Sequence, residues 1–196
     1  MIKKINECDI FAINPNFKVC VHQLGDSKCV IVDDFYVNPE KIRELTLSIP
    51  ASKSMIRNTY PGLSISLGIN LTGLAETFVK LINENFNDGP RKTSNDIREA
   101  FNFMPFLVNV MQGQDQPTPH RDSANPGRFA ASIYLNYNNE SRGGTAFYSE
   151  NGQELGYAEM MFNRLVLYRQ TDVHTAVMQP DWFVGDSYRI NQMMFI

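Results

Sequence analysis

The chain contains only three histidines, and two of them are placed where they could hold one metal ion together with an aspartate. His120 opens the triplet His120-Arg121-Asp122, and His174 follows in a later segment. Two imidazoles and one carboxylate on one face of a cation leave its remaining positions open to other ligands. This ligand set is diagnostic of non-haem Fe(II) oxygenases. We therefore expect His120, Asp122 and His174 to be both metal ligands and catalytic residues.

The elements that carry these three residues must bring them together. In a β-strand, residues i and i+2 point to the same face, so a strand through the triplet would direct His120 and Asp122 inward and Arg121 outward. His174 would supply the third ligand from a distant strand. The triplet alone is a weak motif. A protein-kinase catalytic loop also reads His-Arg-Asp, but the chain has no glycine-rich loop and no Asp-Phe-Gly sequence.

The size and composition of the chain fit one soluble globular domain, with 196 residues, 43% hydrophobic and 20% charged. The net charge of −3 gives no reason to expect a nucleic-acid-binding surface. The first residues lack the apolar stretch of a signal peptide, and no apolar run approaches the roughly 18 residues of a membrane span. We therefore expect a cytoplasmic protein without membrane contact. Its oligomeric state stays open, a homodimer included.

The three cysteines, Cys8, Cys20 and Cys29, form no closely spaced pair. Structural zinc sites usually contain Cys-x(2–4)-Cys pairs, so a zinc site formed with His22 is disfavoured. Without a secretion signal, we expect reduced thiols that act as small buried hydrophobic residues.

The first half of the chain predicts two strands followed by two helices. The strands are Lys18–His22 and Lys28–Val32, joined by a hairpin turn at Gly25-Asp26. One helix begins after the N-cap Asn38, with Pro39 in its first turn, and ends before Pro50. A second helix runs from about Thr72 to Phe86 with one apolar face. We expect both helices to pack on the outside of a sheet.

From about residue 100, short alternating runs are separated by clusters of Gly, Pro, Asn and Asp, which indicates an all-β sandwich or barrel. The expected strands are Phe103–Met111, Phe129–Tyr137, Thr145–Tyr148, Arg164–Tyr168, His174–Met178 and Tyr188–Phe195. We expect a mainly β fold with flanking helices, namely a double-stranded β-helix (a cupin-like jelly roll) with an N-terminal α/β segment. Residues 1–196 would form a single domain, with the N-terminal part at about 1–99 and the jelly-roll core at about 100–196.

Several ordered motifs in the second half match one family. They are Val108–Gly113 followed by Pro119–Asp122, Ala131–Asn136, Gly143–Phe147, Asn163–Tyr168 and Arg189–Asn191. Through these motifs the chain resembles the prolyl-4-hydroxylase-like branch of the 2-oxoglutarate/Fe(II)-dependent dioxygenase superfamily, over about residues 103–196. The Val30–Phe35 segment and the Tyr60–Gly62 turn resemble a bacterial subgroup of that branch whose activity is not assigned.

The resemblance implies a dioxygenase that uses Fe(II), 2-oxoglutarate as co-substrate and O2, and that hydroxylates its substrate with release of succinate and CO2. Fe(II) would bind His120, Asp122 and His174. Arg189 would hold the distal 5-carboxylate of 2-oxoglutarate, since a guanidinium can donate two parallel hydrogen bonds to a carboxylate. Asn191, two residues further on, would add a hydrogen bond from the same strand face.

The chain departs from the family pattern at two positions. Asn191 replaces the usual serine, and Met111 lies near a position where relatives often have a tyrosine that binds the co-substrate. Tyr134 on the next strand, if it points inward, could supply that hydroxyl, although a tyrosine packed in the core fits the sequence equally well. Relatives that halogenate lack the metal-binding carboxylate, so Asp122 favours an oxidation without halide.

The sequence leaves the substrate open among a small molecule, an amino acid and a peptide side chain. Arg121, Arg128 and Trp182 lie in or beside the loops expected to rim the metal site, where they could contact substrate or simply be exposed and packed loop residues. The polar loops Asn138–Arg142 and Ser149–Gly152 could act as lids. Two other function classes remain: a jelly-roll metal protein that does not use 2-oxoglutarate, such as an isomerase or hydrolase, and a non-catalytic binding module.

Overall fold

The structure, a computed structural model, describes residues 10–49, 52–53, 63–64, 72–86, 92–93, 104–108 and 117–196. At 52–53, 63–64, 72–73 and 104–108 it describes the backbone alone. The predictions that concern Cys8, the Tyr60–Gly62 turn and Met111 lie outside the described residues. None of the described helices is long and apolar enough to cross a membrane.

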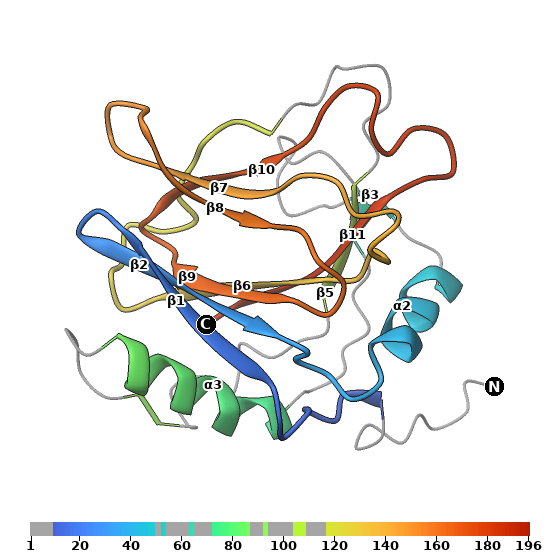
Figure 1. Ribbon diagram of the computed structural model, residues 1–196, viewed down its shortest axis with the longest axis horizontal. Helices are drawn as coiled ribbons and strands as arrows, with labels where there is room; N and C mark the ends of the chain where they lie inside the picture. The colour runs from blue at the N-terminus through green and yellow to red at the C-terminus, as the bar shows by residue number, and fades with distance from the viewer. Residues whose placement is uncertain are drawn as a thin grey trace.

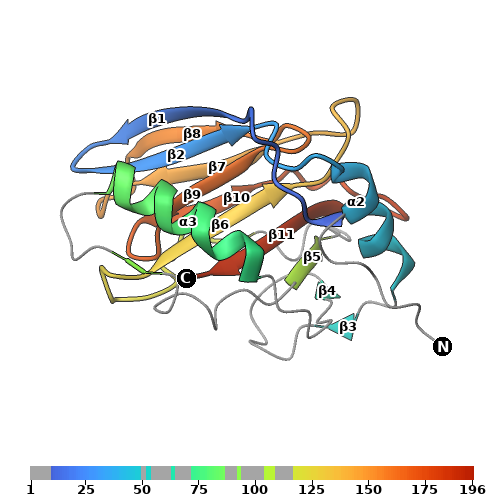
Figure 2. The same cartoon turned by 90° about the horizontal axis from the view of Figure 1, so that it is seen from below.

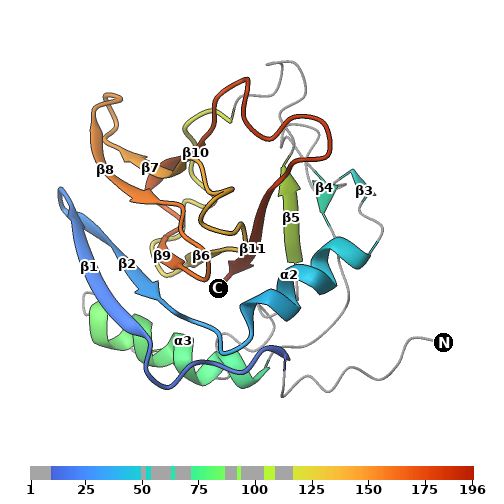
Figure 3. The same ribbon diagram turned by 45° about the vertical axis from the view of Figure 1, so that its right-hand side comes forward.

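Two antiparallel sheets form the body of the molecule (Figure 1). Within the described residues, the large sheet has eight strands in the order β1-β2-β9-β6-β11-β5-β4-β3. Their bounds are β1 Lys18–Leu24, β2 Ser27–Asp33, β3 Ser52–Lys53, β4 Leu63–Ser64, β5 Met104–Val108, β6 Phe129–Tyr134, β9 Leu165–Arg169 and β11 Arg189–Phe195. The small sheet has the order β10-β7-β8 and lies on the opposite side of the large sheet from α3 (Figure 3). Its strands are β7 Gly144–Tyr148, β8 Glu154–Glu159 and β10 Val173–Val177.

The N-terminal strands extend the same sheet that the C-terminal strands form. β2 pairs antiparallel with β9, with Val30 opposite Leu167 and Val32 opposite Leu165. The β1–β2 hairpin closes through Gly25, whose φ of +65° fits the first central position of a two-residue type II′ turn. The N-terminal strands β1 and β2 are therefore an integral part of the large sheet.

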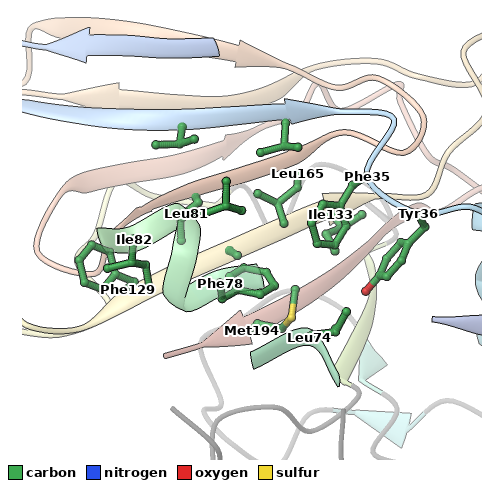
Figure 4. Close-up of a cluster of buried hydrophobic side chains, with 14 of the residues drawn as sticks. Phe35, Tyr36, Leu74, Phe78, Leu81, Ile82, Phe129, Ile133, Leu165 and Met194 are labelled. Atoms are coloured by element: carbon green, nitrogen blue, oxygen red, sulfur yellow. The ribbon is translucent and has the colours of Figure 1, made fainter. Parts of the chain in front are cut away.

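Two helices flank the large sheet. α2 (Pro39–Ser48) begins after Asn38, as expected, although the Asn38 side chain makes no capping hydrogen bond. α3 (Thr72–Asn85) lies across the face of the sheet away from the small sheet (Figure 2). Figure 4 shows Phe78 and Leu81 of α3 among sheet residues that include Ile133 and Leu165, and all four are at most 2% exposed. Burial of an apolar side chain of this size contributes about 1.5–3 kcal/mol, so this contact holds the helix on the sheet.

A second buried cluster fills the space between the two sheets. It contains Tyr134 from β6, Tyr168 from β9 and Phe147 from β7. Because side chains alternate along a strand, Ile133 and Leu167 face α3 while their neighbours Tyr134 and Tyr168 face the small sheet. The inner face of the large sheet and the small sheet thus enclose a shared interior.

This architecture confirms the expected mainly β fold with flanking helices and a double-stranded β-helix core. Several boundaries differ from the sequence prediction. β6 ends at Tyr134, before the expected Tyr137, and β8 was not expected. The expected strand through His120 and Asp122 is instead a single β-bridge between His120 and His174. The reason is that Asp122 already bends away, with its amide bonded to the carbonyl of Gln170.

Candidate metal centre

The bridge between His120 and His174 places two candidate ligands side by side. The backbone N–H of each residue donates to the carbonyl of the other at 3.0 Å, and the imidazole centroids lie 4.7 Å apart. His174 comes from β10 of the small sheet, whereas His120 lies in the segment before β6. Their pairing therefore brings together two residues that are far apart in sequence. A shared metal site requires this closeness in space.

Asp122 closes the third side of the group. The amides of Asp122 and Ser123 both donate to the carbonyl of Gln170, at 3.0 and 3.1 Å, and this fixes the turn after His120. The Asp122 carboxylate then faces both imidazoles, with Oδ1 3.6 Å from His120 Nε2 and Oδ2 3.5 Å from His174 Nε2. The three ligand atoms lie within 4.8 Å of one another. A cation about 2 Å from each atom fits this spacing.

Backbone carbonyls orient both imidazoles for coordination through Nε2. Nδ1 of His120 lies 2.8 Å from the Thr118 carbonyl, and Nδ1 of His174 lies 2.9 Å from the Asp172 carbonyl. Because a carbonyl only accepts, each Nδ1 carries the proton, which leaves the Nε2 lone pair for another partner. Burial lowers the pKa of His174 below its usual range, despite the opposing effect of Asp122. The imidazole is therefore held neutral, the form that binds a metal.

The environment of Asp122 also fits a cation. Oδ2 is buried and has no hydrogen-bond partner among the residues that the structure describes. A buried carboxylate oxygen without a donor is costly, and a cation bound by this carboxylate would reduce that cost by neutralising its charge. The site is open on one side, since the His120 side chain is 37% exposed whereas that of His174 is 6% exposed. The donor set thus fits Fe(II) with protein on one face and access on the other.

Tyr168 is a neighbour of this centre that the sequence analysis did not single out. Its hydroxyl lies 3.1 Å from His174 Nε2, and its ring centroid is 4.5 Å from the imidazole. The motif before His174 does predict a strand there, and alternation places Tyr168 on the same face as Val166. The sequence carried no signal that the hydroxyl would reach the ligand nitrogen.

The three residues predicted to bind the co-substrate form a second group in the interior. Arg189 is 2% exposed, its Nη1 donates to Asn191 Oδ1 at 2.8 Å, and its guanidinium lies over the Tyr134 ring. Asn191 Nδ2 in turn donates to Ser132 Oγ at 3.2 Å. Tyr134 points inward, as one reading of the sequence required, and its hydroxyl lies 2.7 Å from Thr145 Oγ1 on β7.

Arg189 is a buried cation for which the described part of the chain supplies no anionic partner. No carboxylate of the described residues lies within ion-pair distance of its guanidinium, and Nε has no hydrogen-bond partner among them. Unpaired buried charges are strongly disfavoured, so such a residue normally has an anionic ligand. The arrangement therefore fits a carboxylate-containing co-substrate.

β7 connects the two groups. Thr145 and Phe147 are two residues apart and share the interior face of β7. Thr145 contacts Tyr134 of the co-substrate group, while the Phe147 ring lies 5.3 Å from Tyr168 and 6.3 Å from His174. The Gly143-Gly144 step that leads into β7 permits this course: a Cβ on Gly143 would lie 2.1 Å from the Val177 carbonyl oxygen.

Two of the candidate rim residues, Arg121 and Trp182, have protein partners. Arg121 turns outward, forms an ion pair with Glu150 and donates to the Thr171 carbonyl at 2.8 Å. Arg128 is exposed, and Trp182 is half-buried against the cluster between the sheets. In the expected lid loop Asn138–Arg142, the Asn138 side chain accepts a hydrogen bond from the Phe162 amide. None of these contacts identifies a substrate.

Neither Cys20 nor Cys29, the two cysteines that the structure describes, belongs to a candidate metal cluster. Among the described residues, the only group of His, Cys, Asp or Glu that could hold a metal is His120, Asp122 and His174. Cys20 is exposed and Cys29 is buried as a free thiol.

Comparison with solved structures shows that the chain has the fold of the prolyl hydroxylases and other 2-oxoglutarate/Fe(II) oxygenases. A Trichoplax adhaerens prolyl hydroxylase, solved with a peptide of hypoxia inducible factor, superposes with a TM-score of 0.55 at 15% identity, covering 85% of this chain and 82% of the other. A Phytophthora capsici prolyl 4-hydroxylase gives 0.53 at 13% identity, covering 85% and 57%. A 2OG-Fe(II) oxygenase-family oxidoreductase from Burkholderia pseudomallei gives 0.50 at 13%, covering 85% and 82%.

The chain belongs to a family of unknown function, DUF6445, whose model matches residues 15–159. No curated protein matches its sequence. The resemblance inferred from the motifs is thus confirmed, and the fold carries a candidate His-Asp-His metal site in the interior.

Proposed function

We propose that the protein is an Fe(II)- and 2-oxoglutarate-dependent dioxygenase that hydroxylates its substrate. The observation that carries this proposal is the pairing of two features in one interior: a three-residue ligand group, and a buried arginine without an anionic partner among the described residues. Each feature alone occurs in other proteins. Together they match the two parts of the co-substrate, a chelating 2-oxo acid and a distal carboxylate.

In this proposal each group has a distinct task. His120, Asp122 and His174 hold Fe(II) on one face. Arg189 and Asn191 bind the 5-carboxylate of 2-oxoglutarate. When bound, iron and co-substrate supply O2 activation, in which one oxygen atom enters the substrate C–H bond and the other enters succinate as CO2 leaves.

The substrate would approach from the open side of the group, where His120 is partly exposed. We propose a small molecule, an amino acid or a peptide side chain, because such a ligand could reach one exposed imidazole edge at the mouth of an otherwise buried site. A nucleic acid is disfavoured by the net charge of −3. Succinate release, screened over a library of metabolites and peptides, would identify the substrate class.

The site assignment is tested by anaerobic titration with Fe(II) and 2-oxoglutarate. Bidentate chelation of 2-oxoglutarate should give a weak visible charge-transfer band. Asp122→Ala removes a ligand, so we expect metal affinity to fall by more than about 100-fold and the band to be absent. Wild-type metal binding in this variant would contradict the assignment.

A jelly-roll metal protein that does not use 2-oxoglutarate, such as an isomerase or hydrolase, is the main alternative. The variant Arg189→Ala distinguishes this alternative from a 2-oxoglutarate-dependent dioxygenase. It should abolish the charge-transfer band while leaving metal binding intact if the co-substrate is 2-oxoglutarate. Under the alternative, the wild-type protein itself would show no band and no succinate would form with any candidate substrate.

A further inference from the structure

Tyr168 makes a contact that the proposed metal site must break. The hydroxyl lies 3.1 Å from Nε2 of His174, the nitrogen that is left to coordinate a metal. The side chain is 2% exposed, and its ring packs against His174 and Phe147. Tyr168 is therefore held in place by the interior and cannot swing into solvent.

The direction of this hydrogen bond follows from the other imidazole nitrogen. Nδ1 of His174 donates to the Asp172 carbonyl, so neutral His174 has its proton on Nδ1 and a lone pair on Nε2. The Tyr168 hydroxyl is consequently the donor. In the structure it occupies the lone pair that a cation would use.

A cation at the ligand group must displace this hydroxyl from Nε2. A buried hydroxyl that loses its acceptor is destabilising unless it finds another. Asp122 Oδ2 provides one, because it is buried, has no hydrogen-bond partner among the described residues and lies 3.5 Å from the same Nε2. A small movement of the phenol would exchange one acceptor for the other.

We propose that Tyr168 is a positioning residue of the metal centre, whose hydroxyl caps His174 Nε2 without metal and donates to Asp122 Oδ2 with metal bound. This inference rests on the proposed function. Both oxygens of Asp122 face an imidazole and could reach one cation. A hydrogen bond from Tyr168 to Oδ2 would leave Oδ1 as the only Asp122 oxygen on the metal, which would keep the open face less crowded for the co-substrate and O2.

The substitution Tyr168→Phe tests this role because it removes the hydroxyl and keeps the ring contacts. The probes are Co(II), which avoids iron oxidation, and then 2-oxoglutarate added to the Co(II)-loaded protein, both followed by calorimetry and by the visible spectrum. We expect Co(II) to bind several-fold more tightly, because no hydroxyl competes for Nε2 and Oδ2 becomes free to coordinate. We expect 2-oxoglutarate to bind about tenfold more weakly, because a second Asp122 oxygen on the metal would add negative charge and crowd the two positions that a chelating 2-oxo acid needs.

Tyr36→Phe is the matched control. Tyr36 is also 2% exposed, and its hydroxyl donates to Gln192 Oε1 on the opposite face of the large sheet. It should leave both affinities and the Co(II) spectrum as in wild type. A structural role for Tyr168 would instead weaken both ligands together, and that result, or two unchanged affinities, would overturn the inference.

Two variants distinguish the role of Tyr168 from the existence of the metal site. Loss of Co(II) binding in Asp122→Ala together with wild-type behaviour of Tyr168→Phe would reject the role of Tyr168 and leave the metal site standing. Undiminished Co(II) binding in Asp122→Ala would reject the site itself.

Discussion

The two faces of the large sheet are made by alternate residues of the same strands, yet they differ in chemistry. Towards α3, β6 and β11 present Ile133, Ile190 and Met194 to apolar neighbours. Towards the small sheet, the same two strands present Ser132, Arg189 and Asn191, all buried. The polar Gln192 on the α3 side is the exception, and its amide oxygen accepts a hydrogen bond from Tyr36.

Within a single strand, the residues that face α3 thus contribute to stability, and those that face the small sheet are available for ligand binding. The α3 face is a close-packed apolar interface, whose main contribution is the free energy of burial. The inner face keeps the Arg189 guanidinium and several polar groups out of water, and the described residues pair them only in part. This costs stability unless a ligand completes the pairing. Replacing a residue that faces α3 should therefore lower the free energy of unfolding, whereas replacing its neighbour on the inner face should lower the affinity for a ligand.

The largest effect on the fold is expected from Ile190→Ala. Ile190 is 2% exposed within the apolar cluster on the α3 side of the sheet, so truncation should lower the free energy of unfolding by about 2–5 kcal/mol. Chemical denaturation measures this loss. Calorimetry on the fraction that remains folded should give wild-type affinity for 2-oxoglutarate. An affinity change as large as the stability change would contradict the division between the faces.

Arg189→Lys, one residue earlier, should show the reverse pattern. A lysine keeps the charge but loses the planar pair of donors, so affinity for 2-oxoglutarate should fall about tenfold, measured on metal-loaded protein. The free energy of unfolding should fall by only about 1 kcal/mol, because the substitution removes the hydrogen bond to Asn191 and no ion pair with a carboxylate of the described residues.

Arg164→Lys provides the control for Arg189→Lys. Arg164 makes a two-bond pair with Asp33 at 2.6 and 3.0 Å, so it undergoes the same chemical change outside the candidate site. It should leave 2-oxoglutarate affinity unaltered. Equal losses in the two lysine variants would show that the effect is not specific to the interior.

A smaller and purely local effect concerns the cysteines. Cys29 lies on the inner side of β2, where burial raises its pKa to about 12, whereas Cys20 is exposed. A thiol with a raised pKa stays protonated and unreactive at pH 8. Alkylation of native protein at that pH should label Cys20 and spare Cys29, and unfolding should make both react. Rapid labelling of Cys29 in the native state would mean that the inner face is more open than the structure indicates.

The parts of the fold predicted from sequence are those with a local periodic signal. Strands rich in β-branched and apolar residues, such as β6 and β9, were located to within a few residues. β8 was missed because most of its side chains are exposed or half-buried, so it lacks a clear apolar alternation. The two-residue strands β3 and β4 are too short for any pattern.

The candidate site was predictable where residue type alone restricts the chemistry. Histidine is rare in this chain, so His120 and His174 could be selected together. Tyr168 could not be selected from the sequence, because a tyrosine within an apolar strand has the same sequence signature whether its hydroxyl contacts a ligand or packs in a core. Only the register of β9 and β10 in space brings that hydroxyl to His174.

The central claim is that one interior gathers a metal and a dicarboxylic co-substrate. A crystal structure of the protein with Mn(II) and 2-oxoglutarate, prepared without oxygen, tests it most directly. We predict Mn(II) coordinated by His120 Nε2, His174 Nε2 and Asp122, with the distal carboxylate of 2-oxoglutarate paired with Arg189. A metal bound elsewhere, or 2-oxoglutarate that leaves the Arg189 guanidinium without a carboxylate, would contradict the account.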